Sequence, residues 1–430
     1  MNELPNPEEL IDVEPRPPAP HDAYAALRIR DYLLYSLGSL FSGIGSNMQA
    51  VAVGWELYDR TGKAMALGWV GLVQALPVIL FALPAGQLAD RFDRRRLVML
   101  GQFLSAVCSL GLAYLSFTNG PIPAFYVLLF LFAVARSLTW PASSALMPQL
   151  VPREIFSNAV TWKSTSFQIA SVAGPALGGL LIGLFKQAGV TYVITAGLTL
   201  LNLALVAVIA APAVSRAAEQ MSVQSLLAGL GFVRRTKVVL AALTLDLFAV
   251  LLGGATALLP IYASKDFLDV GPTGLGWLRA APAIGAFVMA LALAHRPPLR
   301  RAGPTLLWAV TGFGLTMIGF GLSRIFWFSM LMLILGGALD NISVVVRHSL
   351  VQLSTPDALR GRVSAVNTVF ISCSNELGEF ESGTVAAWFG PIISVVAGGI
   401  GTILVVGASM KLWPEIRKLR SLQDAAVNRD

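Results

Sequence analysis

The sequence predicts an all-α membrane protein with twelve transmembrane helices in two six-helix halves, and two observations carry that prediction. Hydrophobic residues make up 55% of the 430 residues and charged residues only 13%, whereas soluble domains carry about 25% charged residues. The apolar residues also fall into runs of about 20, the length that a bilayer requires. This composition excludes an ordinary soluble enzyme.

Twelve such runs follow one another between charged links or links that contain Pro and Gly. The first six are expected near 32–58, 64–88, 96–117, 122–148, 158–184 and 189–212. The second six are expected near 238–262, 273–294, 304–323, 325–346, 363–386 and 389–412. Because the number of spans is even, both termini should lie on the same side of the membrane.

The polar intervals divide the chain into five segments. The N-terminal tail is rich in acidic residues and proline and is predicted to be largely disordered. The interval between the halves has apolar residues at helical spacing followed by Arg234, Arg235 and Lys237, which is typical of an amphipathic helix on an anionic membrane face. The predicted segments are the tail (1–30), the first bundle (31–212), the amphipathic linker (213–237), the second bundle (238–412) and a C-terminal tail (413–430).

The distribution of basic residues predicts the orientation. Of the 31 Lys and Arg residues, 23 fall in the tails and in links on the side of the termini, 5 in links on the opposite side, and 3 inside spans. Since cytoplasmic loops carry the excess of Lys and Arg, both termini should be cytoplasmic in a bacterial inner membrane.

Short internal matches indicate that the two halves are repeats. Leu67-Gly68-Trp69 recurs as Leu275-Gly276-Trp277, and the segment around Pro152 after the fourth span corresponds to that around Pro356 after the tenth. With six helices per repeat, the halves should be related by an axis along the membrane normal.

The link between the second and third spans carries the most specific motif. Its sequence, Gly86-Gln-Leu-Ala-Asp90-Arg91-Phe-Asp93-Arg94-Arg95-Arg-Leu97, resembles the signature loop of the major facilitator superfamily. Asp93 stands where the broad pattern has glycine. With an acidic residue at this position, the loop is similar to that of the superfamily branch around the enterobactin exporter, the MFS_3 branch.

Two further segments resemble the same exporter branch. Residues 355–363, Thr-Pro-Asp-Ala-Leu-Arg-Gly-Arg-Val, look like the loop before its eleventh span, and residues 225–232, Ser-Leu-Leu-Ala-Gly-Leu-Gly-Phe, look like its linker. The resemblance implies a secondary transporter of the major facilitator fold that works by alternating access.

The fifth span carries Gly174-Pro175-Ala-Leu-Gly178-Gly179, which resembles the end of the antiporter motif, although Ala170 and Thr161 replace its upstream glycines. The resemblance favours export. Close helix packing through small residues is the alternative reading of these glycines, and both readings can hold together.

Charged residues inside spans are candidates for function because a charge near the bilayer centre costs about 2.5–3.5 kcal/mol. The candidates are Arg136, Lys163, Asp246, Arg279, Asp340, Glu376, Glu379 and Glu381. Arg136 resembles the arginine that the family uses in proton coupling, but Trp140 replaces a glycine expected near it. A plain ion pair is its alternative role.

Helical spacing places Asn375, Glu376 and Glu379 on one stripe of the eleventh span. A carboxylate shielded from water can take up and release a proton near neutral pH, so these residues are predicted to carry protons or to line the substrate cavity. Structural hydrogen bonding between helices is the alternative. Glu381 lies about 200° around the helix from Glu379 and should face elsewhere.

The family resemblance also implies a gate. The link formed by Gly86, Asp90, Arg91, Arg94 and Arg95 should brace the cytoplasmic face when the cavity is open outward, with Arg362 at the mouth of the eleventh span. An ion-pair network made in only one state would bias the equilibrium between states.

Several function classes lack their motifs. Gly62-Lys63 is followed by Ala64, so the chain has no nucleotide-binding P-loop, and it has no H-E-x-x-H or G-x-S-x-G sequence. We therefore expect no enzyme activity, cofactor, metal or nucleic-acid partner. The expected partners are the lipid bilayer, protons and a small-molecule substrate, with the protein a monomer.

The expected activity is proton-coupled efflux of a small amphipathic molecule, such as a siderophore or a drug-like compound. Two alternatives stay open at this point. One is a lysophospholipid or nutrient carrier on the same fold, since fold does not fix substrate; the other is a membrane sensor or channel.

The orientation can be tested with reporter fusions. We predict that a reporter that fluoresces only in the cytoplasm is bright when it is fused after Asp430. A reporter that works only outside should be active when it is inserted at Asn119. A dark C-terminal fusion at normal expression would overturn the topology.

Overall fold

The computed structural model describes residues 22–210, 223–296 and 301–418, and its regular elements over these ranges are helices. The first half contains α1 (Arg30–Thr61), α2 (Ala64–Arg91), α3 (Arg94–Phe117), α4 (Ile122–Leu146), α5 (Phe156–Phe185) and α6 (Gly189–Val208). After α7 (Val223–Arg235), the second half contains α8 (Lys237–Leu252), α9 (Leu259–Ala263), α10 (Gly271–Ala294), α11 (Ala302–Leu322), α12 (Phe326–Ser354), α13 (Asp357–Phe389), α14 (Pro391–Leu412) and α15 (Pro414–Lys418).

These helices supply the twelve predicted spans at the predicted places. The seventh span is interrupted after α8 at Gly253-Gly254, and a short 3-10 turn (η5, Ala255–Leu258) leads into α9. By length and composition, ten helical stretches in the described part of the chain can cross a membrane. The two remaining spans are α1 and α13, which are 32 and 33 residues long but carry more polar side chains.

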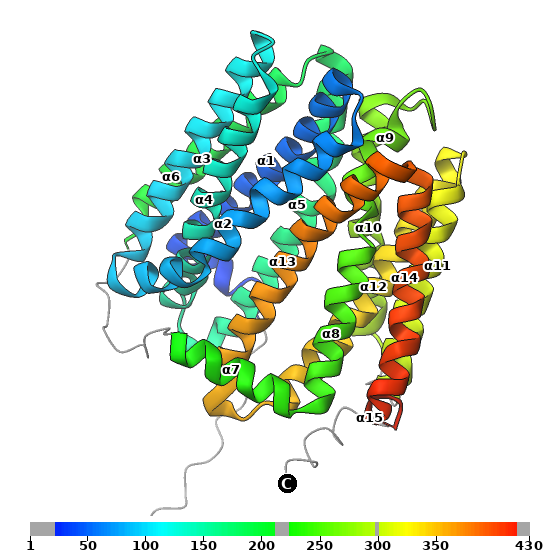
Figure 1. The fold of residues 1–430 in the computed structure, drawn as a ribbon. Coiled ribbons are helices and arrows are strands. Elements are labelled where there is room, and N and C mark those ends of the chain that lie inside the picture. The colour runs from blue at the N-terminus through cyan, green and yellow to red at the C-terminus, as the bar shows by residue number, and fades with distance from the viewer. Residues whose placement is uncertain (1–21, 211–222, 297–300, 419–430) are drawn as a thin grey trace, which may run out of the picture.

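The two halves pack in the same pattern. In the first half α1 packs on α5 and α6, α2 packs on α4, and α3 packs on α4 and α6. The second half repeats this with α8 on α13 and α14, α10 on α12, and α11 on α12 and α14. Figure 1 shows the halves side by side, with α7 crossing beneath α13.

Glycines allow the halves to approach closely on the side opposite the termini. Here α2 crosses α13 and α5 crosses α10. A Cβ atom added at Gly68 would lie 3.2 Å from Cα of Gly383, and one added at Gly179 would lie 2.7 Å from Cα of Gly276. Gly68 and Gly276 are the central residues of the repeated Leu-Gly-Trp segment, so the sequence repeat marks the two equivalent crossings between halves.

The linker helix α7 packs against the second half. Val233 is buried in a cluster with Val239, Leu243 and Val363, and backbone atoms of Arg362 approach Gly229 closely. The linker residues 213–222 lie outside the described residues, as do residues 1–21 of the N-terminal tail.

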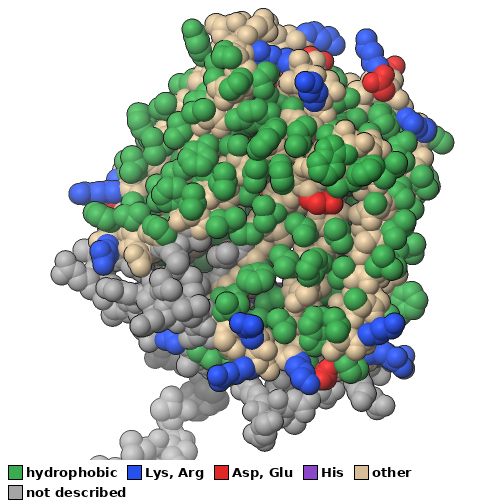
Figure 2. All heavy atoms as spheres, viewed as in Figure 1, with side chains coloured by type: hydrophobic (Ala, Val, Ile, Leu, Met, Phe, Trp, Pro, Cys, Tyr) green, Lys and Arg blue, Asp and Glu red, His purple; other side chains and the backbone are tan. Residues whose placement is uncertain are grey.

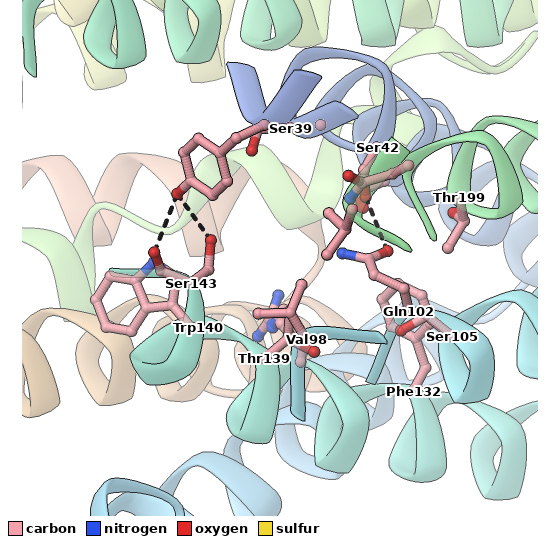
Figure 3. Close-up of a pocket in the computed structure, with 16 residues that line it drawn as sticks. Ser39, Ser42, Val98, Gln102, Ser105, Phe132, Thr139, Trp140, Ser143 and Thr199 are labelled. Atoms are coloured by element: carbon pink, nitrogen blue, oxygen red, sulfur yellow. Dashed lines mark hydrogen bonds between the residues drawn. The ribbon is translucent and has the colours of Figure 1, made fainter. Parts of the chain in front are cut away.

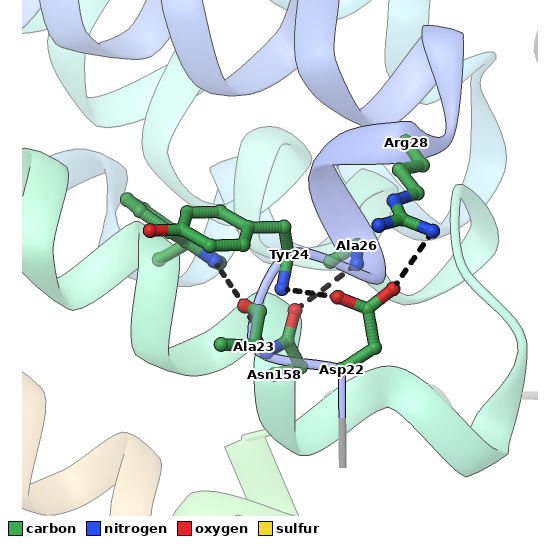
Figure 4. Close-up of polar contacts among 7 residues, drawn as sticks. Asp22, Ala23, Tyr24, Ala26, Arg28 and Asn158 are labelled. Carbon is green, nitrogen blue, oxygen red and sulfur yellow. Dashed lines mark hydrogen bonds and ion pairs between the residues drawn. The ribbon is translucent and has the colours of Figure 1, made fainter. Parts of the chain in front are cut away.

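The segment that precedes α1 docks on the start of α5 (Figure 4). The Asn158 side chain donates to the Ala23 carbonyl at 2.7 Å and accepts from the Ala26 backbone N–H at 3.0 Å, and the Trp162 indole donates to the Ala23 carbonyl at 2.9 Å. The ring of Tyr24 packs on Trp162. Trp162 therefore anchors the entry to α1.

The surface has the character of a membrane protein. Figure 2 shows hydrophobic side chains over the middle of the visible face and Lys and Arg side chains towards its two ends. Large apolar side chains such as Leu80, Trp308 and Leu404 are exposed, as expected where lipid replaces water.

The glycine crossings generate a prediction. In Gly276→Val a new Cβ would lie 2.5 Å from the Pro175 carbonyl oxygen, so α5 and α10 must separate. Overpacking costs about 1–3 kcal/mol, which should shift the population away from the closed arrangement by roughly tenfold. Spin labels at Gln187 and Lys265, in a protein without Cys108 and Cys373, should report a longer distance.

The matched control is Gly197→Val, because a Cβ atom at Gly197 meets no atom within 4 Å. Equal distance distributions for Gly276→Val and the control would show that the crossing does not hold this side closed.

Candidate functional site

A cavity of about 490 Å³ lies between the two halves near the middle of the spans. The first half lines it with α1, α2, α4 and α5, and the second half with η5, α10 and α13. This volume lies within the range of about 300–1,000 Å³ that holds a small organic molecule. We call it the central cavity.

An ion pair crosses the central cavity. The guanidinium of Arg136, on α4, donates through Nη2 to Oε1 of Glu376, on α13. The Arg136 side chain is 46% exposed and that of Glu376 is 13% exposed. Charge-assisted bonds of this kind are stronger than neutral ones, and this one joins the two halves directly.

Two more charged side chains line the same cavity. Glu379 follows Glu376 by about one helical turn, and Arg279 enters from α10. Among the described residues Arg279 has no carboxylate within ion-pair distance. The cavity wall thus carries two arginines and two glutamates, with the Asn375 amide beside them.

The structure brings together five of the residues predicted from the sequence, namely Arg136, Arg279, Asn375, Glu376 and Glu379. Glu381 does not line the central cavity; its carboxylate accepts a hydrogen bond from the Ser382 hydroxyl at 3.4 Å. Lys163 lies half-buried on α5 and is not among the residues that line this cavity.

Asp246 and Asp340 lie in a different place. They face a void of about 10 Å³ inside the second half, and Asp246 forms a buried ion pair with Arg347 of α12. The expected tenth span ends near residue 346, which would leave Arg347 in the link that follows it. This was wrong, because α12 continues to Ser354 and Arg347 is 4% exposed inside the bundle.

The basic residues of the signature loop bind helix ends in the first half. Arg94 donates to the Ala145 carbonyl at 3.1 Å, and Arg95 donates to the carbonyls of Val206 and Ala207. Asp93 caps α3 by accepting from the Arg96 backbone N–H at 3.1 Å. Arg91 is exposed, Gly86 is buried, and the side chain of Asp90 lies outside the described residues.

The glycines of the antiporter-like segment face two neighbours. Gly174 and Gly178 lie against backbone atoms of α1 around Ile44 and Met48, whereas Gly179 lies against α10. Pro175 is buried as well, and its carbonyl contributes to the α10 contact. These residues therefore fix how α5 packs on both halves.

A second cavity, of about 220 Å³, extends from the central cavity into the first half (Figure 3). It lies between α1, α3, α4 and α6 and shares Ser46, Phe132 and Arg136 with the central cavity. We call it the side pocket. This pocket is not among the predicted sites, although Ser39, Ser42 and Ser46 recur at helical spacing in the first span.

Comparison with known proteins decides the family. A family model described as transmembrane secretion effector, MFS_3, matches residues 21–429. The chain belongs to this family of major facilitator superfamily transporters. The transporter is 26% identical over 407 residues to the enterobactin exporter EntS of Shigella boydii serotype 18 and to that of Escherichia coli O81, covering 93% of this chain and 94% of each relative.

Solved structures confirm the fold of the transporter. The nucleoside transporter NupG superposes with a TM-score of 0.70 at 12% identity, covering 89% of this chain and 98% of that one. A D-xylose–proton symporter gives 0.68 at 16% identity, covering 90% and 98%. Both are major facilitator transporters, so the prediction of twelve spans in two six-helix halves is confirmed.

The buried pair in the second half generates a stability prediction. In Arg347→Leu the carboxylate of Asp246 loses its partner inside the bundle, and breaking a buried pair costs about 3–5 kcal/mol. The melting temperature in detergent should therefore fall markedly. The double variant Asp246→Leu/Arg347→Leu should recover much of the loss, because apolar replacement of both partners is often neutral.

Arg136→Leu is the matched control, since its side chain is 46% exposed in the central cavity and its loss should change the melting temperature far less. Equal melting temperatures for wild type and Arg347→Leu would contradict a structural role for this pair.

Proposed function

We propose that the protein is a proton-coupled efflux transporter of a bacterial inner membrane, which exports a small amphipathic molecule by alternating access. The observation that carries the proposal is the Arg136–Glu376 ion pair, which joins the two halves across a cavity large enough for a substrate. Only an interaction that differs between states can drive a switch between them.

The chemistry of the pair suggests how a proton is coupled to movement. When Glu376 is ionised, its carboxylate holds Arg136 and keeps the halves together at the cavity. Protonation removes the negative charge, so Arg136 is released and the halves can separate there. Glu379 and Arg279 lie in the same wall. They provide a second carboxylate and a second cation with which the released side chains can pair.

The proposed orientation places the termini in the cytoplasm and the glycine crossings on the outer side. The halves approach closely at Gly68–Gly383 and Gly179–Gly276. On the termini side of α5 and α4, Thr161, Ser164 and Trp140 are exposed. From these exposed residues we infer that, in this orientation, the cavities open towards the cytoplasm.

Export is proposed from the sequence relationship. The relatives of the transporter that match over almost the whole chain are named enterobactin exporters. The antiporter-like segment of α5 agrees with this direction of transport. We therefore place siderophores and drug-like amphipathic compounds first among candidate substrates.

Substitution of the two glutamates tests the coupling. Glu376→Gln and Glu379→Gln keep the side-chain shape but cannot change charge. In proteoliposomes we predict that each variant loses most of the transport driven by a pH gradient, while substrate exchange without a gradient continues. This split separates coupling from substrate binding.

Glu381→Gln is the matched control on the same helix, because Glu381 does not line the central cavity. Wild-type dependence on the gradient in both cavity variants would assign Glu376 and Glu379 to structure and would overturn the proposed coupling.

A further inference from the structure

The side pocket has a different chemical character from the central cavity. Its polar lining consists of hydroxyl and amide groups together with Arg136, which stands at the junction with the central cavity. Among the residues that the structure describes, no carboxylate or lysine lines the side pocket. A group that entered the side pocket would therefore meet neutral donors and acceptors beyond Arg136.

Two amide side chains of the side pocket can form hydrogen bonds to such a group. The Ser42 hydroxyl donates to Oε1 of Gln102 at 3.2 Å, which leaves the Gln102 amide nitrogen on the pocket side (Figure 3). Asn202 is 4% exposed and lines the pocket. Its Oδ1 has no hydrogen-bond partner but is packed against α1 at Gly38, which leaves the amide nitrogen as the part of the side chain that can reach the pocket. Both amide nitrogens can therefore donate hydrogen bonds to a group in the pocket.

Aromatic side chains also form part of the wall. The Trp140 ring is 56% exposed on the α4 side. Tyr35 also lines the pocket, and its hydroxyl lies 2.9 Å from the Ser143 hydroxyl, so its ring is fixed there. Flat aromatic faces bind rings well. Hydroxyl and amide side chains next to such faces suit a ring that itself carries hydroxyl groups.

We propose that the side pocket binds an uncharged hydroxylated ring of the transported molecule, while the remainder of that molecule lies in the central cavity. At about 220 Å³ the side pocket is smaller than the 300–1,000 Å³ typical of a whole ligand site, so it holds one ring-sized group. This inference rests on the proposed transport function, and it adds a substrate class: molecules with a neutral, hydroxyl-bearing ring.

The test is binding to the purified full-length protein in lipid nanodiscs. The probe is phenyl β-D-glucoside, a neutral hydroxylated ring with an aromatic group. Two related probes are compared with it: phenyl β-D-glucuronide, in which a carboxylate replaces the hydroxymethyl group, and cyclohexyl phenyl ether, in which a cyclohexane ring without hydroxyl groups replaces the sugar ring. We expect saturable binding of the glucoside and at least tenfold weaker binding of the other two.

Asn202→Leu removes the amide and keeps a side chain of similar size. It should weaken glucoside binding about threefold to tenfold, the effect of losing one hydrogen bond. Ser105→Ala, at another buried position of the pocket, gives a second and milder variant should Asn202→Leu fail to fold. The matched control is Asn341→Leu, because Asn341 also has an unpartnered Oδ1 but lies in α12, outside both cavities.

Equal affinities for the glucoside and the ether would overturn the proposal, as would wild-type affinity in both Asn202→Leu and Ser105→Ala. Binding does not require a pH gradient, so failure of proton-driven efflux would leave this result intact. Conversely, efflux with normal coupling but no glucoside binding would reject the side pocket alone.

Discussion

The arrangement of this protein depends on one constraint: a charge at bilayer depth must be paired or hydrated. The chain meets it in two ways. Asp246 and Arg347 pair inside the second half, where both are buried, and such a pair holds helices of one half together. Arg136 and Glu376 pair across the central cavity, where Arg136 is partly exposed. The same physical rule therefore gives one pair suited to stability and another suited to switching.

The glycine crossings complement these charges. A charged pair can be broken by a proton, but backbone contacts at Gly68–Gly383 and Gly179–Gly276 depend only on shape. The two crossings are equivalent by the internal repeat, so both close on the same side of the molecule. The two halves are therefore held together by polar contacts at the centre and by glycine contacts at one end.

The sequence predicts the fold well because a lipid bilayer limits the structures that a chain can adopt across it. Twelve apolar runs, separated by basic links on one side, leave few alternatives, and the spans lie near their predicted places, although the tenth continues to Ser354. Hydropathy is weakest for α1 and α13, since Ser39, Ser42, Glu376 and Glu379 make these helices polar, and these same helices line the cavities. In this protein, the spans of low hydropathy are therefore the ones that line the proposed transport path.

Other features required the three-dimensional structure. The partner of Asp246 could not be found from the sequence, because Arg347 is 101 residues away and seemed to lie beyond the end of its span. The roles of Arg94 and Arg95 also depend on where α4 and α6 end. The side pocket depends on four helices meeting, whereas spacing along the sequence reveals only one face of one helix.

The balance of charge in the central cavity has a consequence for energetics. Its two arginines and two glutamates sum to zero, so uptake of one proton by a glutamate would give the cavity wall a net charge of +1. A membrane potential acts on that charge with about 2.3 kcal/mol per 100 mV for full passage across the field. In the proposed orientation, with the cell interior negative and a glutamate carrying the coupled proton, voltage would draw the protonated form towards the cytoplasmic side. Under that proposal, membrane voltage would add to the driving force that the proton concentration difference supplies.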